Sequence, residues 1–99
     1  MELNEIREQI DAIDEELVGL FNKRMKLSAM VAAYKKENDL PIYVPEREQL
    51  ILQKVAQGAD PALSDYVRNL YLKIFELSRS YQEKCLDISE ISRINTEVV

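Results

Sequence analysis

Arg24 occupies a position where the surrounding spacing predicts an apolar side chain. Leu17, Leu20 and Leu27 follow the three- and four-residue interval of an amphipathic helix, and position 24 lies on the same face. An arginine there must extend to solvent or meet a buried anion. Lys35 follows about 16 Å further along such a helix and about 20° around it. These two long cationic side chains could share one small dianion, and extension of both into solvent is the simpler alternative.

Arg7 is a further cation on the same predicted helix, about 25 Å before Arg24 and about 100° around the axis. Within one straight helix, Arg7 therefore cannot join a site at Arg24 and Lys35. In an antiparallel dimer, Arg7 of the partner subunit could reach that site. Taken alone, Arg7 is an ordinary surface residue near an acidic helix start.

Polar residues recur at helical spacing in the second half of the chain. Ser78 and Gln82 stand four residues apart, which places both on one helix face with hydrogen-bond donors available. Arg47 and Glu48 lie in the first turn of a shorter helix, where Glu48 also suits the helix dipole. A solvated polar surface is the simpler explanation of each pair.

The composition excludes several kinds of site. The 99 residues include 13 Lys and Arg, 18 Asp and Glu and no histidine, giving a net charge of −5. An acidic chain is a poor partner for nucleic acid or an anionic membrane, and no Ser-His triad or histidine metal site is available. The lone Cys85 and the two distant glycines provide neither a thiolate cluster nor a phosphate-binding loop. We expect no metal, no cofactor and, because the acidic N-terminus is unlike a secretory signal, a cytoplasmic location.

The hydrophobic pattern predicts an all-α chain with a long, a short and a long helix. The first runs from Leu3 to about Asn38, and its apolar stripe continues without a proline. The second opens at Pro45 and ends near Gly58, and the third begins with Asp60-Pro61 as cap and first-turn proline. We expect a helical domain over residues 1–87 and a C-terminal tail over residues 88–99 that continues the helix, docks loosely or is disordered.

The length of the first helix bears on the assembly. About 35 residues make a helix roughly 52 Å long, whereas a compact chain of this size is about 33 Å across. The helix must therefore break near Gly19, or a second chain must cover the overhanging apolar stripe. We favour an intertwined two-fold homodimer.

These features together resemble the all-helical chorismate mutases, the AroQ type. The resemblance rests on Ile6-Arg7-Glu8-Gln9-Ile10-Asp11-Ala12-Ile13-Asp14-Glu15, on Val31-Ala32-Ala33-Tyr34-Lys35, and on Pro41-Ile42-Tyr43-Val44-Pro45-Glu46-Arg47-Glu48, with Arg24 between the first two. It covers about residues 3 to 86. It implies an intertwined dimer that converts chorismate to prephenate on the route to phenylalanine and tyrosine, by a rearrangement that requires no nucleophile, metal or cofactor.

The resemblance also implies roles for individual residues. Arg24 and Arg7 of the partner subunit match the arginines that hold the two substrate carboxylates. Lys35 and Gln82 match the donors to the ether oxygen of the breaking bond. Glu48 matches the carboxylate that faces the ring hydroxyl or the ether side, while Arg47 and Ser78 match supporting polar positions.

One position departs from the pattern, because Val44 stands where the mutases often carry aspartate. The related isochorismate-pyruvate lyases resemble this chain in lacking that aspartate, but they tend to be apolar at the position of Glu48. A lyase of the same fold, or a helical binding or regulatory module without activity, therefore remains the alternative to a mutase.

Overall fold

The computed structural model describes the backbone of residues 1–98 and the side chains of residues 1–87. Three α-helices follow one another, α1 (Leu3–Glu37), α2 (Pro45–Gly58) and α3 (Ser64–Val98), with a short 3-10 helix η1 (Pro61–Leu63) before the last. No strand occurs among the described residues. The predicted all-α, long-short-long order is confirmed.

The start of the third helix differs from the prediction. Asp60 and Pro61 open η1 instead of an α-helix, and α3 begins at Ser64. The backbone N–H of Leu63 donates to the carbonyl of Asp60 at 2.8 Å, which is the tighter three-residue bonding of a 3-10 turn. Asp60 stands at the N-cap position of η1 and Pro61 follows it, but the Asp60 side chain makes no capping hydrogen bond. The second helix does begin at Pro45, which holds the first-turn position.

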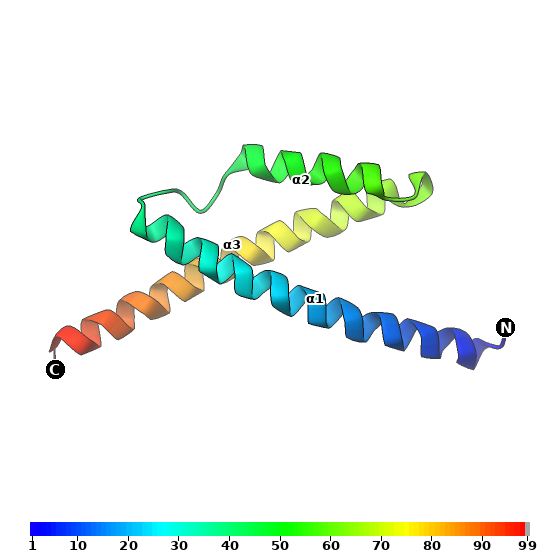
Figure 1. Cartoon of the computed structure of the whole chain (residues 1–99), viewed down its shortest axis with the longest axis horizontal. Helices are drawn as coiled ribbons and strands as arrows, with labels where there is room; N and C mark the ends of the chain where they lie inside the picture. The colour runs from blue at the N-terminus through cyan, green and yellow to red at the C-terminus, as the bar shows by residue number, and fades with distance from the viewer. Residues whose placement is uncertain (99) are drawn as a thin grey trace.

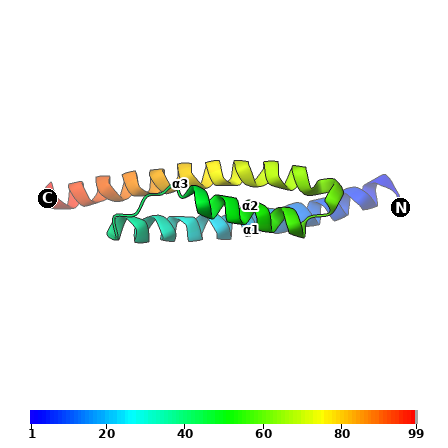
Figure 2. The ribbon, with the colours of Figure 1, turned by 90° about the horizontal axis from the view of Figure 1, so that it is seen from above.

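The first helix passes Gly19 without a break and runs continuously over 35 residues. α1 and α3 cross, and α2 packs on α3. The blue end of α1 and the red end of α3 extend beyond α2 in opposite directions (Figures 1 and 2). The chain measures 63 × 31 × 14 Å, with a radius of gyration of 18.0 Å, whereas a compact chain of this length has about 13 Å. The predicted overhang is therefore present within a single chain.

The extended shape leaves a small core and a large exposed apolar surface. Ala32, Leu52 and Phe75 are the buried hydrophobic residues among those described. Along α1, by contrast, Ile13 is 55% exposed and Leu20 is 61% exposed. Contiguous apolar surface of this kind marks an interaction site in a soluble protein.

α3 continues to Val98, so the backbone of the expected C-terminal tail follows the first of the three predicted options as far as that residue. The side chains of residues 88–98, and all of residue 99, lie outside the described residues, and the boundary at residue 87 stays a prediction. Among the described residues, no helix is both long and apolar enough to span a membrane.

Candidate functional site

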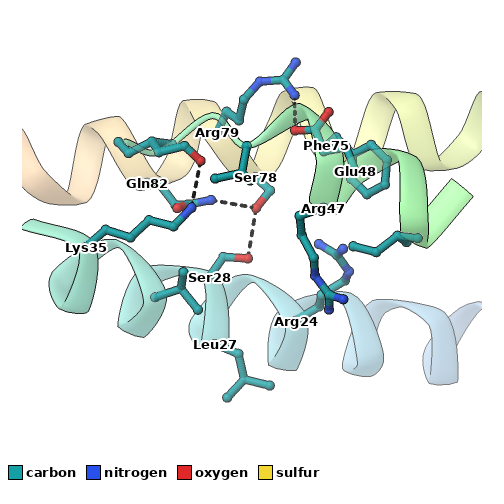
Figure 3. Close-up of a pocket in the computed structure, with 14 residues that line it drawn as sticks. Arg24, Leu27, Ser28, Lys35, Arg47, Glu48, Phe75, Ser78, Arg79 and Gln82 are labelled. Atoms are coloured by element: carbon teal, nitrogen blue, oxygen red, sulfur yellow. Dashed lines mark hydrogen bonds and ion pairs between the residues drawn. The ribbon is translucent and has the colours of Figure 1, made fainter. Parts of the chain in front are cut away.

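The three helices line an open cavity with a volume of about 310 Å³, which is within the size range of small-molecule sites. α1, the connector before α2, α2 itself and α3 all contribute to its wall (Figure 3). The lining residues are Arg24, Leu27, Ser28, Val31, Lys35, Ile42, Val44, Arg47, Glu48, Ile51, Phe75, Ser78, Arg79 and Gln82.

The cavity brings together nearly all of the residues singled out in the sequence. Six of them line it: Arg24, Lys35, Arg47, Glu48, Ser78 and Gln82. Arg7 does not line it, because it lies exposed near the N-terminal end of α1. The separation of Arg7 from the other cations is the one that the helix geometry predicts within a single chain.

Arg24 packs against aromatic rings instead of extending freely into solvent. Its guanidinium carbon lies 6.0 Å from the ring centroid of Tyr71 and 5.9 Å from that of Phe75. Contacts at this distance are favourable cation–π interactions. Among the described residues no carboxylate forms an ion pair with Arg24, so its hydrogen-bond donors remain available to an anion in the cavity.

Lys35 is positioned by the connector that precedes α2. Its ammonium group donates a hydrogen bond to the backbone carbonyl of Ile42 at 2.8 Å. This bond ties the end of α1 to the connector and fixes the half-buried side chain at the cavity wall (Figure 3). An ammonium group has three donors, so the tie to Ile42 leaves two for a ligand.

A chain of buried polar side chains crosses from α3 to α1. Gln82 Nε2 donates to Ser78 Oγ at 3.1 Å, and Ser78 Oγ donates to Ser28 Oγ at 2.9 Å. Ser78 is 6% exposed and Gln82 is 7% exposed. Gln82 Oε1 is buried without a hydrogen-bond partner among the described residues. The unpaired Oε1 is an acceptor, and its free-energy cost would be removed by a donor on a ligand. The Gln82 amide has two N–H donors, of which one bonds to Ser78, so the second can donate to a ligand oxygen.

Glu48 and Arg79 form an ion pair across the cavity wall, from α2 to α3. The hydrogen bond to Glu48 raises the pKa of the Arg79 guanidinium above its ordinary value. The Arg79 guanidinium carbon also lies 4.7 Å from the ring centroid of Tyr43 in the connector. Glu48 is thus held by a cation that the sequence reasoning missed.

Ser28 and Arg79 were both absent from the predicted site, although a signal for each exists in the sequence. Ser28 lies four residues after Arg24, which places it on the same face of α1. Arg79 directly follows Ser78 and lies three residues before Gln82, so it borders the same face of α3. Its pairing with Glu48, by contrast, depends on how α2 packs on α3.

The cavity is suited to a small anion that carries further oxygen atoms. Arg24, Lys35 and Arg47 have no carboxylate partner among the described residues, and buried donors lie beside them. Val44 and Ile51 contribute apolar surface to the same wall. Within the part of the chain that the structure describes, no group of acidic and cysteine side chains could hold a metal ion.

Known proteins are similar in sequence to this chain over most of its length. Residues 6–83 match the family model described as chorismate mutase type II. The chain is 48% identical over 54 residues to the bifunctional chorismate mutase/prephenate dehydratase of Aquifex aeolicus, covering 54% of this chain and 15% of that protein. It is 47% identical over 60 residues to the T-protein of Haemophilus influenzae, covering 61% of this chain and 16% of that protein.

A relative of similar length supports the same relationship. The chain is 35% identical over 75 residues to the chorismate mutase of Methanocaldococcus jannaschii, covering 76% of this chain and 74% of that protein. The aligned part of the chain therefore spans only a small part of the Aquifex aeolicus and Haemophilus influenzae proteins, but most of the Methanocaldococcus jannaschii protein. Because the family match extends over residues 6–83, the chain belongs to the chorismate mutase type II family.

Proposed function

We propose that this chain catalyses the rearrangement of chorismate to prephenate in phenylalanine and tyrosine biosynthesis. The observation that carries the proposal is the cavity itself, in which three cations without a carboxylate partner among the described residues lie beside buried hydrogen-bond donors in a member of this family. Chorismate is a small dicarboxylate with an ether oxygen and a ring hydroxyl, and the cavity offers a group suited to each.

The proposed roles follow the positions of the side chains. Arg24 binds one substrate carboxylate, and Arg7 of the partner subunit binds the other. Lys35 and Gln82 donate to the ether oxygen, where negative charge grows as the carbon–oxygen bond breaks. Arg47 and Ser78, with Glu48 toward the ring hydroxyl, complete the polar wall.

The chemistry explains why a chain without histidine can be an enzyme. The rearrangement has one substrate and needs no nucleophile, so the protein contributes by holding a reactive conformer and stabilising charge. Fixing the reacting atoms in a near-attack geometry can supply up to about 7–11 kcal/mol. Each preorganised donor at a developing oxyanion contributes about 3–4 kcal/mol. Both effects require ordered side chains in the cavity, and the hydrogen bond between the buried Gln82 and Ser78 supports such order.

A homodimer is the second part of the proposal. The exposed apolar face of α1 needs a cover, and a two-fold partner with the same face would bury both. Such an arrangement would also place the exposed N-terminal part of α1, with Arg7, at the cavity of the other subunit. We also propose the cytoplasm as the compartment, where the free thiol of Cys85 would stay reduced.

The direct experiment is to incubate the purified protein with chorismate and follow the loss of its ultraviolet absorbance. We expect loss of chorismate and accumulation of prephenate. The same protein with isochorismate should release no fluorescent salicylate, and its release would identify a lyase instead. A protein that acts on neither compound, although folded by circular dichroism, would favour a binding module.

Val44 allows a test of electrostatics at the start of α2. It is the N-cap residue of that helix and makes no side-chain capping bond. Val44→Asp adds a carboxylate close to Arg47 at the cavity wall, and Val44→Asn adds an uncharged cap of the same shape. A carboxylate at position 44 could accept a hydrogen bond from the ring hydroxyl of chorismate. Since a hydrogen bond to a charged group contributes about 1.5–3 kcal/mol, we expect kcat/KM for chorismate to be about 10-fold higher in the Asp variant than in the Asn variant. Thermal unfolding should show a similar gain for both from the new cap, and equal kcat/KM values would remove any role for charge at position 44.

A further inference from the structure

Among the residues that the structure describes, Arg79 is the one cation of the cavity wall that forms an ion pair. The lining carries four cationic side chains and a single carboxylate, and Arg79 pairs with that carboxylate, Glu48. The pairing leaves Arg24, Lys35 and Arg47 to face a dianionic substrate. In Figure 3 the Arg79 guanidinium lies above Glu48, whereas Arg24 and Arg47 lie on the other side of that carboxylate.

Three parts of the chain meet at this pair. Glu48 is on α2, Arg79 is on α3, and Tyr43, whose ring lies under the Arg79 guanidinium, belongs to the connector. The Arg79 side chain is 29% exposed and that of Glu48 is 20% exposed, so both are partly shielded from water. A guanidinium held by a ring on one side and a carboxylate on the other loses little further freedom, and it restricts Glu48 to a narrow set of orientations.

We propose that Arg79 is a positioning residue that fixes the Glu48 carboxylate against the cavity and balances its charge, so that this carboxylate can accept a hydrogen bond from a dianionic substrate. The inference rests on the proposed function. Without Arg79, the Glu48 carboxylate would be free to adopt other orientations, and it would lie less often where the substrate hydroxyl is proposed to bind. Arg79 itself does not touch the substrate and acts through Glu48.

The test is a double-mutant cycle on kcat/KM for chorismate with Arg79→Met, Glu48→Gln and the double variant. We expect Arg79→Met to lower kcat/KM by about 10-fold or more in the chain with Glu48, because a small misplacement of a contacting group has effects of this size or larger. In the Glu48→Gln background, where no carboxylate remains to be positioned, the same substitution should change kcat/KM by less than about 2-fold. Arg79→Lys, which keeps the charge but loses the planar fork, should recover part of the activity.

Arg68→Met serves as the matched control, because Arg68 is an exposed arginine of α3 that does not line the cavity. It should retain the wild-type kcat/KM, and circular dichroism should show that every variant is folded. Equal losses from Arg79→Met in both backgrounds would overturn the inference, since Arg79 would then act independently of Glu48. If the wild-type chain itself leaves chorismate unchanged, the proposed function fails, and the role of Arg79 fails with it. An active wild type with additive losses would remove only the role of Arg79.

Discussion

Replacing Lys35 by alanine should lower kcat for chorismate by about 100- to 1,000-fold, the loss typical of removing one oxyanion donor. KM should change much less. The ether oxygen of bound chorismate is nearly neutral, and it becomes negatively charged only as its bond to carbon breaks. An ammonium group at that oxygen therefore interacts more strongly with the transition state than with the substrate, and only such differential binding raises kcat.

The structure supplies the geometric reason for the size of this effect. The Lys35 ammonium is held by the Ile42 carbonyl at 2.8 Å, so it does not have to be ordered during the reaction. Lys35→Ala also removes this tie to the connector, and part of the loss could come from a displaced connector. Lys35→Arg separates the two causes, because arginine can still donate to Ile42 but presents a planar fork in place of a compact point charge. We expect Lys35→Arg to keep the wild-type melting temperature while kcat remains at least about 10-fold low.

Lys23→Ala is the matched control for Lys35→Ala, since Lys23 is an exposed lysine of α1 that does not line the cavity. Its kcat should equal that of the wild type. An unchanged kcat in Lys35→Ala would contradict the proposed role of Lys35. Recovery of full activity in Lys35→Arg would instead indicate that Lys35 acts mainly by holding the connector.

The sequence alone predicts some elements of the fold and leaves others undetermined. The long helices were predictable because Leu17, Leu20 and Leu27 repeat at helical spacing over many turns, and that local pattern needs no tertiary information. The 3-10 turn at Pro61–Leu63 was not predictable, because a proline in the first turn suits both a 3-10 helix and an α-helix. Which of the two forms depends on one backbone hydrogen bond. Gly19 similarly left a broken helix open, and the continuous α1 resolves that choice.

The candidate site shows the same division between local and tertiary information. Arg24 could be singled out because a cation interrupts an apolar stripe, which is a property of one helix. The contacts of Arg24 with Tyr71 and Phe75 could not be predicted, because they come from the crossing of α1 and α3. The pair of Glu48 with Arg79 joins residues 31 positions apart, and nothing in either local sequence predicts that these two side chains meet.

Mixing two inactive variants should restore activity if Arg7 completes the cavity of the partner subunit. Arg7→Ala and Arg24→Ala each remove one of the two arginines proposed to bind the substrate carboxylates, and each homodimer then has two defective sites. We expect each variant alone to lose about 100-fold or more in kcat/KM, since a buried charged contact to substrate is worth several kcal/mol when truncated. The apolar face of α1 is intact in both variants, so both should still assemble.

A mixed dimer differs from either parent because its two sites are unequal. One site combines Arg24 of the first chain with Arg7 of the second and is intact, while the other lacks both arginines. Unfolding and refolding equal amounts together gives mixed dimers in about half of the assemblies, and half of their sites are active. The mixture should therefore recover about a quarter of the wild-type activity per site, as two-fold symmetry requires.

The control for this experiment is a mixture of each variant with itself after the same refolding, which should remain inactive. Size-exclusion chromatography with light scattering should give a dimer mass for wild type and both variants. A monomer mass would contradict the assembly, and a dimer without recovery would show that Arg7 does not cross between subunits. The exposed position of Arg7, far along α1 from Lys35, makes recovery the expected result: within one straight helix the two ends cannot reach the same small substrate, so a site that uses both must be built from two chains.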